Sequence, residues 1–160
     1  MRELTRYRRA SLEDVSQIEE MEEVNFSEEA FSRRQIRYLL QSPNTIALTA
    51  CSNSKVLGYI MGLGRRGSSV VRIYTFCVRK DYRHKRIGTS LLQRLERECQ
   101  RRGLFNLILE VGEGNASALG FYKKNGFVEF SRIPRYYTDK TTAIRMRKVL
   151  TKTVNSSRRL

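Results

Sequence analysis

Glu110 is the residue of this sequence with the clearest capacity for chemistry, because it is a carboxylate inside an apolar run. The surrounding segment, residues 107–111, is otherwise leucine, isoleucine and valine, so both faces of a strand here are expected to be buried. An ionised carboxylate in such surroundings is costly unless it is hydrated or paired, and burial favours uptake of a proton. Glu110 is therefore either a general base or a structural carboxylate paired with a nearby arginine.

Two polar residues follow on the next predicted helix, residues 115–125. Asn115 begins this helix, where its side chain can cap the first turn or bond amide groups of a ligand. Tyr122 lies two turns further along and faces the same groove. A buried tyrosine on a helix is more often a core residue.

A short basic loop precedes these residues. The stretch 76–89, FCVRKDYRHKRIGT, runs from an apolar strand end into a helix that begins near Gly88. Unpaired backbone N–H groups and the positive end of the helix dipole meet at such a junction, which is suited to a pyrophosphate. A pyrophosphate loop beside a proton-transfer group suggests a coenzyme A site.

Cysteine and histidine provide little alternative chemistry. Cys77 is a rival candidate, as a nucleophile that carries an acyl group, but the only histidine that could activate it is His84 in the basic loop. With Cys51 and Cys99 it makes an odd, widely spaced set, so we expect reduced core thiols. One histidine leaves zinc without a usual ligand set, and no metal is expected.

Seven strands and four helices are expected to position these residues within one domain, residues 1–150, before a polar, frayed tail, residues 151–160. A strand, helix and strand over 70–111 imply local parallel pairing within an otherwise antiparallel sheet. The periodicity predicts strands over 4–9, 45–51, 56–63, 70–78, 107–111, 127–133 and 142–146, and helices capped by Ser11, capped by Ser27, from Gly88 to Gly103 and over 115–125.

Composition limits the class of protein and its partners. A net charge of +15 over 160 residues attracts RNA and other polyanions without specificity. The basic residues are spread over many segments, which favours a solvated basic surface over a dedicated nucleic-acid site. No apolar run approaches the roughly 18 residues of a membrane span, and the first ten residues lack a signal-peptide core. We expect a cytoplasmic protein without membrane association.

The order of elements and two motifs resemble the GNAT (GCN5-related) N-acetyltransferase superfamily over residues 4–150. YRHKRIGTSLL is similar to its acetyl-CoA signature, Q/R-x-x-G-x-G/A, and LEVGEGNASALGFYKKNGF is similar to the LEVR-x-x-N-x-x-A-x-x-LY-x-x-x-GF segment of the RimI-like and Ard1-like protein N-terminal acetyltransferases. The resemblance implies an α+β, three-layer GNAT fold with a mixed, mostly antiparallel sheet of about seven strands and about four helices. It also implies acetyl-CoA in a splay between the fourth and fifth strands.

The resemblance assigns a role to each candidate residue. Glu110 would be the general base, acting through an ordered water, and Tyr122 would protonate the departing thiolate. Asn25 and Phe26 would face Tyr136 and Tyr137 across the bound peptide. Acetyl-CoA would be bound by Phe76, Cys77, Val78, Arg83, His84, Lys85, Arg86, Ile87, Gly88, Thr89, Asn115 and Tyr122, with the acyl oxygen at backbone N–H groups around Cys77 and Val78.

One signature position departs from the family pattern. Arg86 stands where the family has its first glycine. Its side chain either obstructs the approach of the backbone to the pyrophosphate or swings outward and pairs with a phosphate.

The expected activity is transfer of acetyl from acetyl-CoA to the N-terminal α-amine of proteins, including ribosomal or nascent chains, by direct attack in a ternary complex. The basic surface is consistent with ribosome association. Three alternatives remain open: a lysine acetyltransferase, a small-molecule acetyltransferase, and a basic ribosome-binding or RNA-binding protein with a vestigial GNAT fold. The small-molecule reading predicts an acidic acceptor pocket, whereas RIPRYYTDK, residues 132–140, is basic and aromatic.

Overall fold

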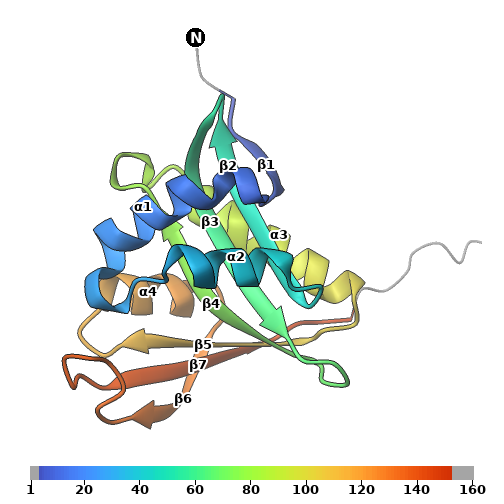
Figure 1. Ribbon diagram of the computed structural model, residues 1–160. Coiled ribbons are helices and arrows are strands. Elements are labelled where there is room, and N and C mark those ends of the chain that lie inside the picture. Colours follow the sequence, from blue (N-terminus) through green and yellow to red (C-terminus); the bar gives the residue numbers. More distant parts are fainter. Residues whose placement is uncertain (1–3, 153–160) are drawn as a thin grey trace, which may run out of the picture.

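Seven strands form one mixed sheet in the computed structural model, which describes residues 4–152 (Figure 1). The strands are β1 (Arg6–Arg9), β2 (Thr45–Ser52), β3 (Lys55–Gly64), β4 (Val70–Val78), β5 (Asn106–Gly112), β6 (Val128–Ile133) and β7 (Ala143–Val149). They lie in the order β1-β2-β3-β4-β5-β7-β6. Every neighbouring pair is antiparallel except β4 and β5, which are parallel.

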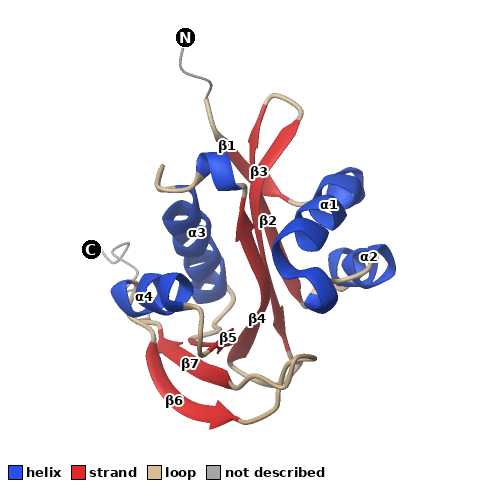
Figure 2. Ribbon diagram, turned by 90° about the vertical axis from the view of Figure 1, so that its left-hand side faces the viewer, coloured by secondary structure: helices blue, strands red, loops and turns tan. Residues whose placement is uncertain are grey.

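Helices cover both faces of this sheet. Figure 2 shows α1 and α2 on one face and α3 and α4 on the other. The predicted three-layer α+β fold is therefore confirmed. The helices are α1 (Val15–Phe26), α2 (Arg33–Gln41), α3 (Ile87–Arg101) and α4 (Ala116–Lys124), and the short 3₁₀ turns are η1 (Leu12–Asp14), η2 (Ser27–Glu29) and η3 (Lys80–Tyr82).

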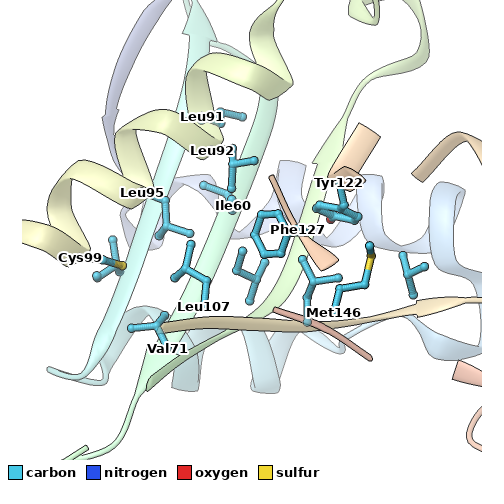
Figure 3. Close-up of a cluster of buried hydrophobic side chains, with 14 of the residues drawn as sticks. Ile60, Val71, Leu91, Leu92, Leu95, Cys99, Leu107, Tyr122, Phe127 and Met146 are labelled. Carbon is cyan, nitrogen blue, oxygen red and sulfur yellow. The ribbon is translucent and has the colours of Figure 1, made fainter. Parts of the chain in front are cut away.

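The core under α3 is built from one face of that helix. Leu91, Leu92, Leu95 and Cys99 recur at helical spacing and are all fully buried. They pack with strand residues such as Leu107 (Figure 3). This packing fixes the N-terminal end of α3 beside the end of β4.

Helix starts follow local capping chemistry. The predicted pairing of Ser11 with Asp14 is confirmed, because the Ser11 N–H donates to Asp14 Oδ2 at 2.8 Å, but Ser11 caps the turn η1 and Asp14 is the N-cap of α1. The predicted cap at Ser27 is wrong. Ser27 begins the 3₁₀ turn, and Ser32 caps α2 by accepting a hydrogen bond from the Gln35 N–H at 3.2 Å. Ser32 and Gln35 form a reciprocal capping box, which satisfies two backbone donors.

The three cysteines, Cys51, Cys77 and Cys99, are free and buried, so the expectation of reduced core thiols is confirmed. Among residues 4–152, no helix combines the length and apolarity needed to cross a bilayer. The tail predicted to be frayed lies, from residue 153 onward, outside the described residues.

Candidate active site

The parallel strands β4 and β5 separate after a short paired stretch. Their pairing covers only residues 70–72 of β4, whereas β3 remains paired with β4 as far as Val78. From Ile73 to Val78, β4 therefore has a strand neighbour on one side only. This is the predicted splay, and it leaves backbone groups of β4 available to a ligand.

A bulge in β4 changes which face its side chains occupy. Tyr74 has no partner in β3, because the register shifts between Ile73 and Thr75. Ile73 packs into the core beneath α3, whereas Cys77 packs into the core beneath α1. A regular strand would place both on one face. Past the bulge the side chain of Phe76 lies toward α3, and Cys77 can offer only its backbone to that side.

The loop before α3 leaves the first N–H groups of this helix open. Arg86 is the N-cap and makes no side-chain cap hydrogen bond. The first N–H that bonds back to the cap is that of Ser90, which donates to Arg86 O at 3.0 Å. The N–H groups of Ile87, Gly88 and Thr89 precede it and have no intrahelical acceptor. They are suited to bind a pyrophosphate, as predicted for this loop.

The side chains of this loop differ in what they can reach. Ile87 is 4% exposed and packs in the core, so only its backbone is available. His84 and Lys85 are exposed. Arg83 donates from Nη2 to Asn25 Oδ1 at 2.8 Å, which ties the loop to the end of α1. Arg83, which is predicted to bind acetyl-CoA, therefore forms a hydrogen bond with Asn25, which is predicted to bind the peptide.

Arg86 adopts a left-handed backbone conformation, with φ of 63° and ψ of 13°. This conformation costs a residue with a Cβ about 1 kcal/mol, and glycine adopts it freely. Arg86 therefore replaces the family glycine at a position whose backbone conformation favours glycine.

We expect Arg86→Gly to raise the free energy of unfolding by up to about 1 kcal/mol and to weaken acetyl-CoA binding roughly tenfold, through loss of a phosphate-pairing guanidinium. Arg86→Ala is the matched control, because it loses the guanidinium but keeps the strained Cβ. Calorimetry and urea unfolding measure the two quantities. Tighter binding by the glycine variant than by the unmodified protein would instead establish obstruction by Arg86.

Glu110 is held by two arginines from the neighbouring strands. Arg72 Nε donates to Oε2 at 3.0 Å, while Arg145 donates to Oε1 from Nε at 3.2 Å and from Nη2 at 3.1 Å. The carboxylate side chain is 5% exposed. The paired state, one of the two alternatives for this residue, is therefore present. Oε2 accepts a single hydrogen bond and keeps a lone pair free for a proton donor.

Tyr122 lies in an aromatic cluster beside the open stretch of β4. Its ring centroid is 6.3 Å from that of Phe76 and 5.4 Å from those of Phe121 and Phe127. Burial raises the pKa of Tyr122, so its hydroxyl is protonated at neutral pH. Within residues 4–152, nothing donates to or accepts from this hydroxyl. A Cβ added to Gly88 would lie 3.6 Å from Phe76, so the start of α3 borders the same cluster.

Asn115 caps α4, because its Oδ1 accepts a hydrogen bond from the Ala118 N–H at 3.1 Å. Its side-chain NH₂ group makes no hydrogen bond within the described residues. Capping and a contact with a ligand can therefore coexist at this position.

Two loops meet on the α1 side of the site. Glu29 Oε1, in η2, accepts a hydrogen bond from the Thr138 N–H in the β6–β7 loop at 2.6 Å. Tyr136 accepts from Arg72 Nη2 at 2.7 Å, which links this loop to the arginine that holds Glu110. The Tyr136 and Tyr137 rings pack edge to face, with centroids 4.9 Å apart. Burial raises the pKa of Tyr137 to about 12.

Phe26 ends α1 next to these loops and is partly buried against the core under α1. The structure therefore places the predicted peptide segment around Asn25 and Phe26 on the same side as the β6–β7 loop.

Glu22 is a buried carboxylate that the sequence analysis missed. It is 1% exposed, and its Oε1 accepts hydrogen bonds from the hydroxyls of Thr75 and Tyr59, the latter at 2.9 Å. Its Oε2 accepts from the Phe31 N–H at 3.2 Å. Burial raises its pKa. Glu22 thus joins the α1–α2 loop to the bulged part of β4. The sequence signal for its burial is its position four residues after Ile18, on the apolar face of α1.

We expect Glu22→Gln to lower the free energy of unfolding by about 1–3 kcal/mol, because an amide cannot reproduce three accepted hydrogen bonds and leaves a buried donor unsatisfied. Glu23→Gln is the control, since Glu23 is adjacent and exposed. Urea unfolding of both variants tests this expectation. Equal stability of the two would show that the Glu22 hydrogen bonds contribute nothing net.

Comparisons of the sequence and of the fold with known proteins both find acetyltransferases. The Acetyltransferase (GNAT) family model matches residues 12–127. N-alpha-acetyltransferase 30 of Schizosaccharomyces pombe is 28% identical over 124 residues, which cover 73% of this chain and 80% of that protein.

Two solved structures share the fold. Ard1 from Thermoplasma volcanium matches with a TM-score of 0.84 and 25% identity, over 92% of this chain and 98% of that one. The PaiA N-acetyltransferase from Thermoplasma acidophilum, solved in complex with coenzyme A, matches with a TM-score of 0.76 and 22% identity, over 91% of this chain and 99% of that one.

Proposed function

The chain belongs to the GNAT acetyltransferase family, and we propose that it transfers an acetyl group from acetyl-CoA to the N-terminal α-amine of a protein. The family identifies it as an N-acetyltransferase, as the sequence predicted. One observation supports the proposed site above the others. Glu110 lies on β5 beyond the last residue paired with β4 and contacts Arg72, where that pairing ends, whereas Tyr122 on α4 contacts Phe76 within the unpaired stretch of β4.

Donor and acceptor would reach this stretch from opposite sides of the sheet. The open N–H groups of α3 and the aromatic cluster of α4 lie on one face, whereas the α1–α2 loop and the β6–β7 loop lie on the other side of the site (Figure 2). This arrangement favours direct attack with both substrates bound.

In the proposed reaction, the neutral amine attacks the thioester carbonyl carbon. The carbonyl oxygen becomes an oxyanion, for which backbone N–H groups around Cys77 and Val78 are the candidate donors. The amine passes a proton, through water, to Glu110, whose Oε2 has a free lone pair. The carbon–sulfur bond then breaks, and the leaving thiolate takes the hydroxyl proton of Tyr122. Glu110 ends as a neutral carboxylic acid and Tyr122 as a phenolate, and exchange of one proton with solvent at each group restores the starting state.

The environment of Cys77 favours direct attack over an acyl-enzyme route. Burial raises the pKa of this thiol to about 11, so it is protonated at neutral pH and is a weak nucleophile. Its side chain also lies in the core beneath α1, away from the aromatic cluster.

The acceptor assignment depends on the relatives and on the loop chemistry. N-alpha-acetyltransferase 30 is named for acetylation at the α-position. The β6–β7 loop carries two basic residues, Arg135 and Lys140, with Tyr136 and Tyr137 and one acidic residue, Asp139, and its net positive charge disfavours a cationic polyamine.

A peptide library that varies the first two residues tests this assignment when it is incubated with acetyl-CoA and read by mass spectrometry. Spermidine and an N-terminally blocked peptide with an internal lysine are the matched controls. We expect a mass gain of one acetyl group on free N-termini only. Equal or faster modification of either control would move the acceptor class to small molecules or to lysine.

A further inference from the structure

A cavity of about 440 Å³ opens between β1, β2 and α3. None of its lining residues belongs to the proposed active site. Six arginines line it: Arg8, Arg9, Arg94, Arg97, Arg101 and Arg102.

Few carboxylates compensate these arginines. Arg8 is paired with Asp14, whose Oδ1 and Oδ2 each lie 2.8 Å from the guanidinium. Glu98 accepts hydrogen bonds from both Arg101 and Arg102, and the Arg101 hydrogen bond holds its pKa at about 2, so it is ionised. The six arginines and these two carboxylates give a net charge of +4, because Arg101 and Arg102 share one carboxylate.

Three of the arginines have no carboxylate partner anywhere in residues 4–152. Arg94 and Arg97 are one turn apart on the exposed side of α3, and Arg9 projects from the opposite wall on β1. All three are exposed. An exposed arginine presents a fork of N–H donors that matches the oxygens of a phosphate.

An aromatic ring lies among these charges. The Arg94 guanidinium carbon is 4.4 Å from the centroid of the Tyr7 ring. Tyr7 and Arg94 therefore form a cation–π pair that lines the positively charged cavity.

From this combination we propose that the cavity binds a single-stranded nucleic acid through its phosphate backbone. Proteins that bind single strands combine a positive groove for the phosphates with flat side chains on which bases stack. The net charge of +15 would draw such a polyanion to the surface. An acidic peptide would satisfy the guanidinium groups but would supply no flat base to pack against the Tyr7–Arg94 pair. This binding does not depend on the acetyl-transfer chemistry.

Fluorescence anisotropy with labelled single strands of about 20 nucleotides, in RNA and DNA form, tests the proposal over a range of salt concentrations. The test variant is Arg94→Ala with Arg97→Ala. Its matched control is Arg65→Ala with Arg66→Ala, which removes the same charge from exposed residues of the β3–β4 turn that do not line the cavity. Acetyl transfer to a short peptide, unchanged in both double variants, establishes that they are folded.

We expect the test variant to bind at least about tenfold more weakly and to lose about 1.4 from the slope of log affinity against log salt, which corresponds to two phosphate contacts on a single strand. The control should change affinity by less than about threefold, because Arg65 and Arg66 do not line the cavity and contribute only to the overall positive charge. The tighter of the two strands identifies RNA or DNA as the source of the phosphates.

Three results would overturn the proposal. Equal losses in the two double variants would indicate a diffuse field without a site. Competition by inorganic phosphate at the same total phosphate concentration would indicate a site for a free anion. Competition by poly-glutamate as strong as that by RNA would assign the cavity to an acidic protein partner.

Discussion

Replacing Tyr122 with phenylalanine is expected to lower kcat by roughly 10² to 10⁴-fold, the usual contribution of a positioned acid or base. The reason is the state of the hydroxyl: burial raises its pKa, so it carries a proton, and no described residue competes for it. The ring contacts with Phe76, Phe121 and Phe127 do not involve the oxygen and remain in the variant. Stability and acetyl-CoA affinity should therefore change little.

An acetyl donor with a more acidic thiol separates this role from a general disturbance. Such a leaving group needs less help from an acid, so the defect of Tyr122→Phe should shrink with it. Single-turnover rates are the appropriate measurement, because slow product release can hide a chemical step. A defect of the same size with both donors would show that the hydroxyl does not protonate the leaving thiolate.

Glu110→Gln is expected to lower kcat by a similar factor, roughly 10² to 10⁴-fold, if the carboxylate accepts the amine proton. The variant also leaves Arg72 and Arg145 without their shared anion, which would destabilise the fold by itself. Arg145→Gln is the matched control, because it removes the Arg145 contacts to Oε1 but keeps the carboxylate and its contact with Arg72.

The two roles of Glu110 predict different outcomes for this pair of variants. A proton acceptor requires that Arg145→Gln keep most of the rate that Glu110→Gln loses. A purely structural ion pair requires that the loss of rate follow the loss of unfolding free energy in both variants. Urea unfolding alongside the kinetics distinguishes these patterns.

Elements with strong local signals could be predicted from the sequence. The apolar run at residues 107–111 and the helical spacing of Leu91, Leu95 and Cys99 agree with β5 and α3 within one or two residues. The pattern predicts a cap at Ser27, whereas Ser32 caps α2: both serines precede a helical pattern, and only the reciprocal hydrogen bonds with Gln35 distinguish them.

Contacts that span the chain could not be predicted in this way. Glu110 bonds Arg72 and Arg145, which are 38 and 35 residues away, and these pairings depend on strand order and register. The left-handed conformation of Arg86 could not be predicted either, because arginine has no preference for positive φ.

The burial of Glu22 was difficult to predict because of its sequence neighbours. It is one of four glutamates within residues 19–23. Its spacing from Ile18 places it on the apolar face of the helix, but its partners Tyr59 and Thr75 are given only by the fold.

The pH dependence of the single-turnover rate, with peptide and acetyl-CoA both saturating, tests most directly whether this site performs acid–base acetyl transfer. For the unmodified protein we predict a rate that rises with pH through the apparent pKa of the base or the amine and then levels. Glu110→Gln should have a lower rate and a limb that shifts or flattens, because solution hydroxide must replace the carboxylate. A full single-turnover rate in Glu110→Gln, with the same limb, would contradict the base assignment and leave a site that works by orienting a free amine against the thioester.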